Sequence, residues 1–260
     1  MKKWDPAYYD TNCVLQYNTA MKMLESFSFN KNDLVLDIGS GSGRITNQIA
    51  QLVPNGHVTG LDFSQEMVDF SQKKYQATNL SFVQCDVLDM HYENQFDVIL
   101  SFWTLSWVKD QTIAFSNISN ALKPDGKLLI MYPLRHDTYD IAEALIKQSQ
   151  WQGFFKNKFQ LRPFMTEEQY MNTCHSEYME TSVIKKEILC HFSSAAEMHA
   201  SIRSWMSHLD VLPNEELKQA FLIDFTEAYL KHRGLSEPIM FFSVLEVSGK
   251  KKAPYLTARM

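Results

Sequence analysis

The residues that most clearly suggest chemistry form a glycine-rich run that begins with an acid. Residues 37 to 44 read Asp-Ile-Gly-Ser-Gly-Ser-Gly-Arg and follow directly on a short apolar stretch. Glycines at such a turn let backbone N–H groups approach a ligand closely, and the N-terminus of a following helix adds partial positive charge. Asp62 lies 19 residues after Gly43, where an acid can accept hydrogen bonds from ribose hydroxyls. Together these features predict a nucleoside-binding site rather than a merely tight turn.

The spacing of the glycines separates two kinds of nucleoside cofactor. A dinucleotide site has the pattern G-x-G-x-x-G, whereas here the glycines are Gly39, Gly41 and Gly43, and Arg44 stands where the last one should be. Asp37, beside the loop, would repel a pyrophosphate but suits a cofactor that carries an ammonium group. The loop therefore favours a cationic nucleoside cofactor.

The elements that must position this loop alternate between strand and helix. Short apolar runs predict strands at 34–38, 58–62, 80–85, 96–101 and 127–132, and the intervening stretches predict helices at 45–53, from Ser64 onward, and at 110–122. This alternation indicates a parallel sheet with helices on both faces. Beyond Arg135 the pattern predicts aromatic-rich helices within 138–173, a strand at 183–192, helices at 195–209 and 214–232, and a last strand at 239–247.

We therefore expect an α/β fold, a Rossmann-like, doubly wound, mostly parallel sheet with a helical insert that caps the substrate. No linker rich in Gly, Pro or Ser divides the 260 residues, so a single domain is expected. Its parts are an N-terminal helical segment (1–30), a cofactor-binding core (31–133), the helical insert (134–180), C-terminal strands and helices (181–250) and a basic, flexible tail (251–260).

Composition excludes several other classes of protein. The net charge of −5 argues against a nucleic-acid backbone as the main partner. The longest uncharged apolar run, 98–108, is about half of the roughly 20 residues that a bilayer requires, and Lys2 and Lys3 are not followed by the apolar region of a signal peptide. The four cysteines form no C-x-x-C pair and no zinc-like spacing with the eight histidines. We expect a cytoplasmic chain with no metal, no membrane contact and no obligate protein partner.

The order of motifs over residues 30 to 133 resembles the class I S-adenosylmethionine-dependent methyltransferases, whose first motif is an acid followed by G-x-G-x-G. The resemblance implies S-adenosylmethionine as the cofactor, with an acid after the second strand on its ribose and a Cys-Asp-Val stretch, residues 85–87, on its adenine. The Ser-Phe-Trp run that begins at Ser101 resembles the motif of this family that faces the cofactor. The expected cofactor residues are Asp37, Gly39, Ser40, Gly41, Gly43, Asp62, Phe63, Met67, Asp86, Val87, Ser101 and Phe102.

The flanking segments resemble two narrower families. Trp4-Asp5-Pro6 and Trp205 are similar to parts of trans-aconitate methyltransferases, and Tyr9, Val14-Leu15-Gln16 and residues 96–111 are similar to insect juvenile hormone acid methyltransferases. In the second family a glutamine and a tryptophan hold the substrate carboxylate, which implies this role for Gln16 and Trp107. We expect the rest of the substrate site to include Tyr9, Trp103, His136 and Trp151.

The chemistry of methyl transfer favours a carboxylate acceptor. A carboxylic acid with a pKa near 4 is ionised at neutral pH, whereas an amine or phenol with a pKa of about 10 lies about three units, or roughly 4 kcal/mol, from its reactive form. Such an acceptor needs a base. His136 is the candidate base in this region, although a solvent-exposed loop histidine is the favoured interpretation. The Gln16 amide and the Trp107 N–H are neutral donors that orient a carboxylate without quenching it. The prediction is O-methylation of a small-molecule carboxylic acid, giving a methyl ester.

Several alternatives remain at the level of sequence. N- or C-methylation of another small metabolite with His136 as base is one, and a non-catalytic S-adenosylmethionine-binding protein is another. A macromolecular substrate is disfavoured, because no N-P-P-Y-like motif follows the fourth strand. Gln16 fits a surface position and Trp107 a core position as well as the ligand roles. The insert either caps an apolar pocket or forms its own core with its aromatic residues, which are Trp151, Phe154, Phe155, Phe159, Phe164 and Tyr170.

Overall fold

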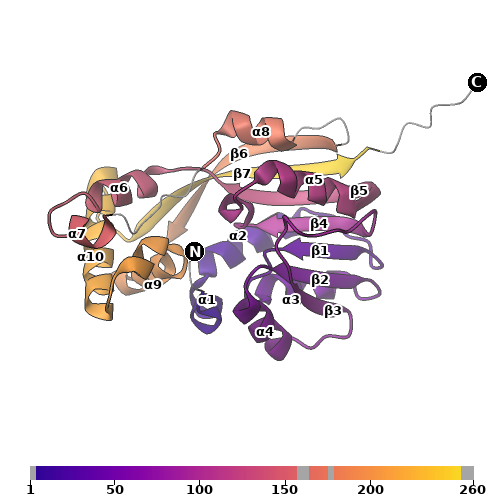
Figure 1. Ribbon diagram of the computed structural model, residues 1–260, viewed down its shortest axis with the longest axis horizontal. Coiled ribbons are helices and arrows are strands. Elements are labelled where there is room, and N and C mark those ends of the chain that lie inside the picture. The colour runs from indigo at the N-terminus through magenta and orange to yellow at the C-terminus, as the bar shows by residue number, and fades with distance from the viewer. Residues whose placement is uncertain (1–3, 157–163, 175–178, 253–260) are drawn as a thin grey trace, which may run out of the picture.

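The computed structural model describes residues 4–156, 164–174 and 179–252, and within them a single seven-stranded sheet has the order β3-β2-β1-β4-β5-β7-β6 (Figure 1). β7 runs antiparallel to both β5 and β6, and the other pairs of neighbouring strands are parallel. The strands are β1 (Leu34–Ile38), β2 (His57–Asp62), β3 (Leu80–Gln84), β4 (Phe96–Phe102), β5 (Leu122–Pro133), β6 (Met179–His191) and β7 (Ile239–Lys251). The predicted Rossmann-like, mostly parallel sheet is confirmed.

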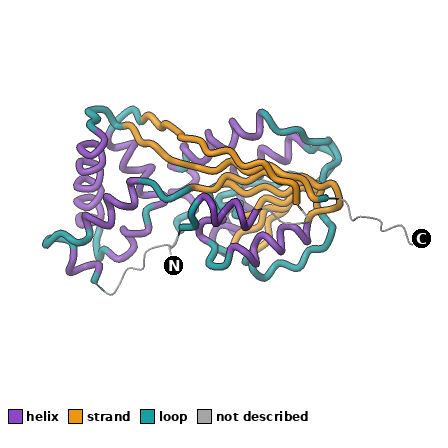
Figure 2. Tube along the Cα trace, turned by 90° about the horizontal axis from the view of Figure 1, so that it is seen from above, coloured by secondary structure: helices purple, strands orange, loops and turns teal. Residues whose placement is uncertain are grey.

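Helices occupy both faces of the sheet and one end of the molecule (Figures 1 and 2). The α-helices are α1 (Pro6–Asn12), α2 (Val14–Glu25), α3 (Arg44–Leu52), α4 (Gln65–Lys74), α5 (Gln111–Ala121), α6 (Asp137–Leu145), α7 (Gln152–Phe155), α8 (Glu167–Cys174), α9 (Ala195–Trp205) and α10 (Glu215–Arg233). Two 3-10 helices are Leu105–Trp107 and Ser207–Val211. None of the helices in the described ranges is long and apolar enough to cross a membrane.

Alternate residues of the parallel strands face two separate cores. Val35 and Val98 pack with α2 and α3, whereas their neighbours Leu36 and Ile99 pack with α5 and α8. This period of two follows from the pleat of a strand, and burial on both faces explains why the strands are almost wholly apolar. The strand order reverses between β1 and β4, the point at which open α/β sheets bind their ligands.

A third core lies among α6, α7, α9 and α10, which Figure 1 shows at one end of the long strands β6 and β7. Trp151, 4% exposed, lies inside it, and its indole N–H donates to the Asp224 carboxylate at 2.8 Å. Phe155 is buried in the same core and Tyr170 in the core beneath α5 and α8. These aromatics of the insert are therefore core residues rather than a lid, while Phe159 lies outside the described residues.

The last strand is longer than the sequence predicts. β7 pairs with β5 and β6 beyond Val247 and reaches Lys251, whose ammonium group donates to the Leu122 carbonyl at 2.7 Å. Lys251 therefore belongs to the sheet, and the prediction of a flexible tail is wrong at this residue. Residues 253–260 lie outside the described part of the chain.

The hydroxyl of Tyr229 fastens α10 to the sheet, and we expect its removal to weaken the fold. It accepts the backbone N–H of Phe241 at 2.9 Å in a partly buried contact, and Tyr229 itself is fully buried. Tyr229→Phe leaves that N–H without its partner and should lower the free energy of unfolding by about 1–3 kcal/mol, measured by urea denaturation. Tyr92→Phe is the matched control, since the Tyr92 hydroxyl makes no hydrogen bond within the described ranges. Equal losses in the two variants would contradict the assignment.

Candidate active site

A cavity of about 250 Å³ lies beyond the C-terminal ends of β1, β2, β3 and β4, at the switch point of the sheet. We call it the cofactor cavity. Residues from the loop after each of these strands line it. The lining residues that the sequence predicted for the cofactor are Gly39, Gly41, Asp62, Phe63, Met67, Asp86, Val87 and Phe102. Eight of the twelve predicted cofactor residues thus surround one cavity.

The glycine loop that forms one wall has a shape that only glycine permits at Gly39. Its φ is +77°, and a Cβ there would lie 2.0 Å from Oγ1 of Thr104. The N–H groups of Gly39 and Ser40 both donate to the carbonyl of Leu61, at 2.7 and 3.0 Å. The loop is thereby bound to the end of β2 while Thr104 closes over it from the end of β4.

Asp62, the last residue of β2, fixes the same loop through its carboxylate. One oxygen accepts the N–H of Gly41 at 2.8 Å and the other accepts the N–H of Ser64 at 2.9 Å. Burial raises the pKa of this carboxyl group, and the two N–H donors partly offset that rise. The acid that the sequence assigned to ribose binding therefore lines the cavity and also shapes its wall.

Four predicted cofactor residues line neither of the two cavities described here: Asp37, Ser40, Gly43 and Ser101. Ser101 is buried, and its hydroxyl donates to the carbonyl of Ile38 at 2.9 Å, which joins β4 to the start of the loop. Asp37 is buried beneath the loop and accepts the hydroxyl of Thr46 at 2.6 Å. Ser101 and Asp37 therefore stabilise the glycine loop without lining the cofactor cavity.

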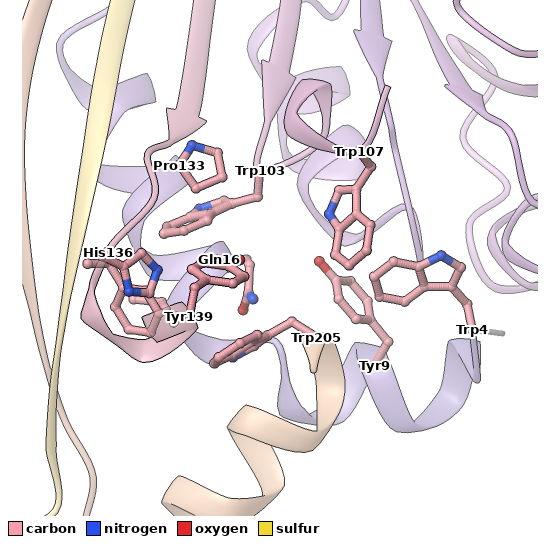
Figure 3. A pocket seen from close by; sticks show the side chains of 11 residues that line it. Trp4, Tyr9, Gln16, Trp103, Trp107, Pro133, His136, Tyr139 and Trp205 are labelled. Atoms are coloured by element: carbon pink, nitrogen blue, oxygen red, sulfur yellow. The ribbon is translucent and has the colours of Figure 1, made fainter. Parts of the chain in front are cut away.

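A second cavity, of about 50 Å³, adjoins the first, and we call it the acceptor cavity (Figure 3). Its wall consists of aromatic, apolar and neutral polar side chains, without an Asp, Glu, Lys or Arg among the eleven. They are Trp4, Tyr9, Leu15, Gln16, Trp103, Trp107, Pro133, His136, Tyr139, Trp205 and Phe242. Trp4, Tyr9, Trp103 and Trp107 also line the cofactor cavity, so the two cavities meet at these four rings.

The structure brings Gln16 and Trp107 together, as the sequence predicted. Gln16 is only 5% exposed on α2, and its Oε1 has no hydrogen-bond partner in the part of the chain that the structure describes. Trp107 is 38% exposed on the 3-10 helix after β4 and points into the cavity (Figure 3). The surface alternative for Gln16 and the core alternative for Trp107 are both wrong.

Tyr9 and Trp103 stand at the junction of the cavities. Burial raises the pKa of Tyr9 well above its usual value, so its phenol stays protonated and can donate a hydrogen bond. Trp103 has a φ of +60°, a conformation that is costly for a bulky residue and is concentrated at functional sites. Its indole N–H donates to the Thr19 hydroxyl at 3.0 Å, so Trp103 offers the cavity its ring rather than a donor.

The structure corrects the sequence analysis at two residues. His136 is 8% exposed rather than on an open loop: its Nδ1 lies 2.7 Å from the Thr138 hydroxyl and its ring packs edge-on against Phe242. It lines the acceptor cavity. Trp151 lines neither cavity, because it belongs to the core of the helical end, and its predicted contact with substrate is wrong.

Six residues of the acceptor cavity were not among the predicted site residues: Trp4, Leu15, Pro133, Tyr139, Trp205 and Phe242. The last three come from α6, α9 and β7, which are far apart in the sequence, so no local spacing links them. Trp205 marks a family resemblance in the sequence, but no pattern around it indicates a pocket. Among the described residues no group of His, Cys, Asp and Glu has the arrangement of a metal site.

The buried carboxyl group of Asp37 should make the stability of the protein depend on pH. Burial raises its pKa from 3.8 to about 6, against the opposing hydrogen bond from Thr46. Because the pKa is higher in the folded state, stability is lost as pH rises through the window from about 4 to about 6. Asp37→Asn should therefore be more stable than the wild type at pH 8, by on the order of 3 kcal/mol, and the difference should vanish near pH 4. Chemical denaturation at both pH values measures it, and a difference that is independent of pH would refute the assignment.

Comparisons with known proteins agree with this geometry. A model of the methyltransferase domain matches residues 29–178. The chain is 26% identical to the malonyl-[acyl-carrier protein] O-methyltransferase of Bacillus cereus over 75% of this chain and 74% of that one. It is 30% identical to the juvenile hormone acid O-methyltransferase of Bombyx mori over 57% of each.

A solved structure shares the fold. The phosphoethanolamine N-methyltransferase 2 of Haemonchus contortus, in complex with S-adenosyl-L-methionine, superposes with a TM-score of 0.62 at 18% identity, over 95% of this chain and 56% of that one. The family match covers the glycine loop, the acid after β2 and the loop after β4, which together form the cofactor cavity. The chain therefore belongs to the class I S-adenosylmethionine-dependent methyltransferases.

Proposed function

We propose that this methyltransferase esterifies a small organic acid, by transferring a methyl group to a carboxylate oxygen. The observation that carries the proposal is the wall of the acceptor cavity. It has neutral donors and no charged side chain, and Oε1 of the buried Gln16 amide has no hydrogen-bond partner among the residues that the structure describes. Two relatives are named as O-methyltransferases, that of Bacillus cereus for malonyl-[acyl-carrier protein] and that of Bombyx mori for juvenile hormone acid.

The residues around the cofactor cavity fit S-adenosylmethionine. The left-handed glycine loop leaves room where Cβ atoms would stand, and the carboxylates of Asp62 and Asp86 suit a cation better than a pyrophosphate. In this proposal Asp62 holds the ribose, while Asp86 and Val87 hold the adenine. When bound, S-adenosylmethionine supplies an activated methyl group on a positively charged sulfur.

The protein's main contribution to such a reaction is alignment. Positioning of two reactants can supply roughly 7–11 kcal/mol of a barrier. The shared rings of Trp4, Tyr9, Trp103 and Trp107 place a molecule in the acceptor cavity directly beside the cofactor cavity. Their aromatic faces also attract positive charge, which suits a site where a methyl cation equivalent is transferred.

The donors of the acceptor cavity suit a carboxylate in particular. In the proposed complex Nε2 of Gln16 donates to one carboxylate oxygen, and the indole of Trp107 lies beside the reacting group. The protonated phenol of Tyr9 is a third neutral donor. Because a carboxylic acid is already ionised at neutral pH, this arrangement requires no base.

Methylation of an amine is the second candidate, and one observation favours it. His136 is buried in the acceptor cavity, where a base for an amine substrate would stand, and aromatic rings surround it. The structural neighbour from Haemonchus contortus is named an N-methyltransferase, which makes this chemistry compatible with the fold. The two candidate reactions give products that differ in their stability to mild base.

Methyl-labelled S-adenosylmethionine with a panel of small acids and amines separates them. A methyl ester releases labelled methanol in mild base, whereas an N-methyl product retains its label. We expect base-labile label with at least one acid and no loss of that activity in His136→Ala. Base-stable label that disappears in His136→Ala would overturn the proposal in favour of N-methylation.

Replacing Gln16 by glutamate tests the role of its amide. Gln16→Glu keeps the shape of the side chain but sets a carboxylate against the substrate's carboxylate, so kcat/KM should fall about 100-fold or more, equivalent to about 3 kcal/mol. The affinity for S-adenosylhomocysteine should change little, since Gln16 does not line the cofactor cavity. Gln51→Glu, at an exposed position of α3, adds the same charge away from the site as a control. Full activity in Gln16→Glu would remove Gln16 from the mechanism.

The glycine loop gives a separate test of the cofactor site. Gly39→Ala forces a Cβ against Thr104 in a left-handed conformation, so the loop or Thr104, which both line the cavity, must shift. We expect at least tenfold weaker binding of S-adenosylhomocysteine in calorimetry, about 1.4 kcal/mol or more. Gly153→Ala is the control, because nothing lies within 4 Å of its added Cβ. Equal affinities in both variants would place the cofactor elsewhere.

A further inference from the structure

Two buried polar atoms without a hydrogen-bond partner in the described part of the chain belong to side chains that line the acceptor cavity. They are Oε1 of Gln16, an acceptor, and Nε1 of Trp205, a donor. Both side chains line the acceptor cavity and neither lines the cofactor cavity. Figure 3 shows the amide of Gln16 directed toward the ring of Trp205. Buried polar atoms are almost always paired, so this pair indicates a group that the protein is built to receive.

The chemistry of the pair specifies that group. It must accept a hydrogen bond from the indole N–H and donate one to the amide oxygen. A hydroxyl does both. A second carboxylate in this place satisfies the indole alone and repels the amide oxygen. An apolar group leaves both Oε1 of Gln16 and Nε1 of Trp205 without a hydrogen bond.

We propose that the substrate is a small hydroxy acid, whose hydroxyl group is bound by Trp205 and Gln16. This inference rests on the proposed carboxylate acceptor: Nε2 of Gln16 meets the reacting carboxylate, and Oε1 of the same amide meets the hydroxyl. Trp205 is then a specificity-determining residue that contacts the substrate away from the transferred methyl group.

The size of the cavity agrees with a compact substrate. A single water needs about 10–15 Å³ of such space, so about 50 Å³ accommodates a group of a few non-hydrogen atoms. Helix α9, which carries Trp205, is joined to the helix that carries Tyr9: the hydroxyl of Tyr8 donates to the carbonyl of Ala200 at 3.3 Å. This hydrogen bond between α1 and α9 fixes Tyr9 and Trp205 relative to each other on the wall of the acceptor cavity.

Calorimetry on the protein saturated with S-adenosylhomocysteine tests the inference, with butanoate, 2-hydroxybutanoate, 3-hydroxybutanoate and succinate as probes. We expect one of the hydroxy acids to bind at least tenfold more tightly than butanoate and than succinate. Trp205→Phe keeps a ring but removes the N–H, so it should reduce this ratio to less than about threefold. Trp151→Phe removes an indole N–H outside both cavities and should keep the ratio.

The wild-type ratios decide the question even where Trp205→Phe does not fold. Equal dissociation constants for butanoate and both hydroxy acids would overturn the inference, and so would tightest binding of succinate or an unchanged ratio in folded Trp205→Phe. Ester formation is assayed in parallel with the same acids. Selective binding without an ester would overturn the proposed methyl transfer alone, and ester formation without selectivity would overturn the role of Trp205 alone. An absence of binding by every probe would overturn both the proposed methyl transfer to an acid and the role of Trp205.

Discussion

Asp62 accepts the backbone N–H groups of Gly41 and Ser64, and these hydrogen bonds tie the glycine loop after β1 to the end of β2. Other parts of the wall of the cofactor cavity adjoin this junction. Gly39 rests against Thr104 from the end of β4, and Asp37 is buried beneath the loop at an electrostatic cost that raises its pKa to about 6. A fixed loop of this kind holds a ligand without reorganising when the ligand arrives.

The acceptor side is built on a different principle. Its wall is aromatic and uncharged, and it is assembled from α1, α2, the loop after β4, the start of α6, the end of α9 and β7. Ionised side chains hold the cofactor cavity in shape, whereas neutral donors line the acceptor cavity. A nucleophile that is already charged keeps its reactivity between neutral donors. Trp103, whose backbone is strained, provides one of the four rings at the junction of the acceptor cavity and the cofactor cavity.

The sequence predicts the cofactor half well because its signals are local. Asp37, the glycines and Asp62 follow buried strands directly, and parallel strands bring their C-terminal ends to one edge of the sheet. The acceptor half has no such signal. Trp205 and Phe242 reach the cavity only through tertiary packing of the C-terminal helices and the long β7. The density of aromatic residues in the insert does not show which of them belong to a core and which line a pocket. Trp151 belongs to a core, although the sequence predicts it at the substrate site, whereas Tyr139 of the same insert lines the acceptor cavity.

A crystal structure of the ternary complex with S-adenosylhomocysteine and an acid tests the central claim most directly. We expect a carboxylate oxygen within hydrogen-bond distance of the Gln16 amide and in line with the sulfur, between the rings of Trp103 and Trp107. A carboxylate bound away from the Gln16 amide, with only solvent between the rings of Trp103 and Trp107, would contradict it.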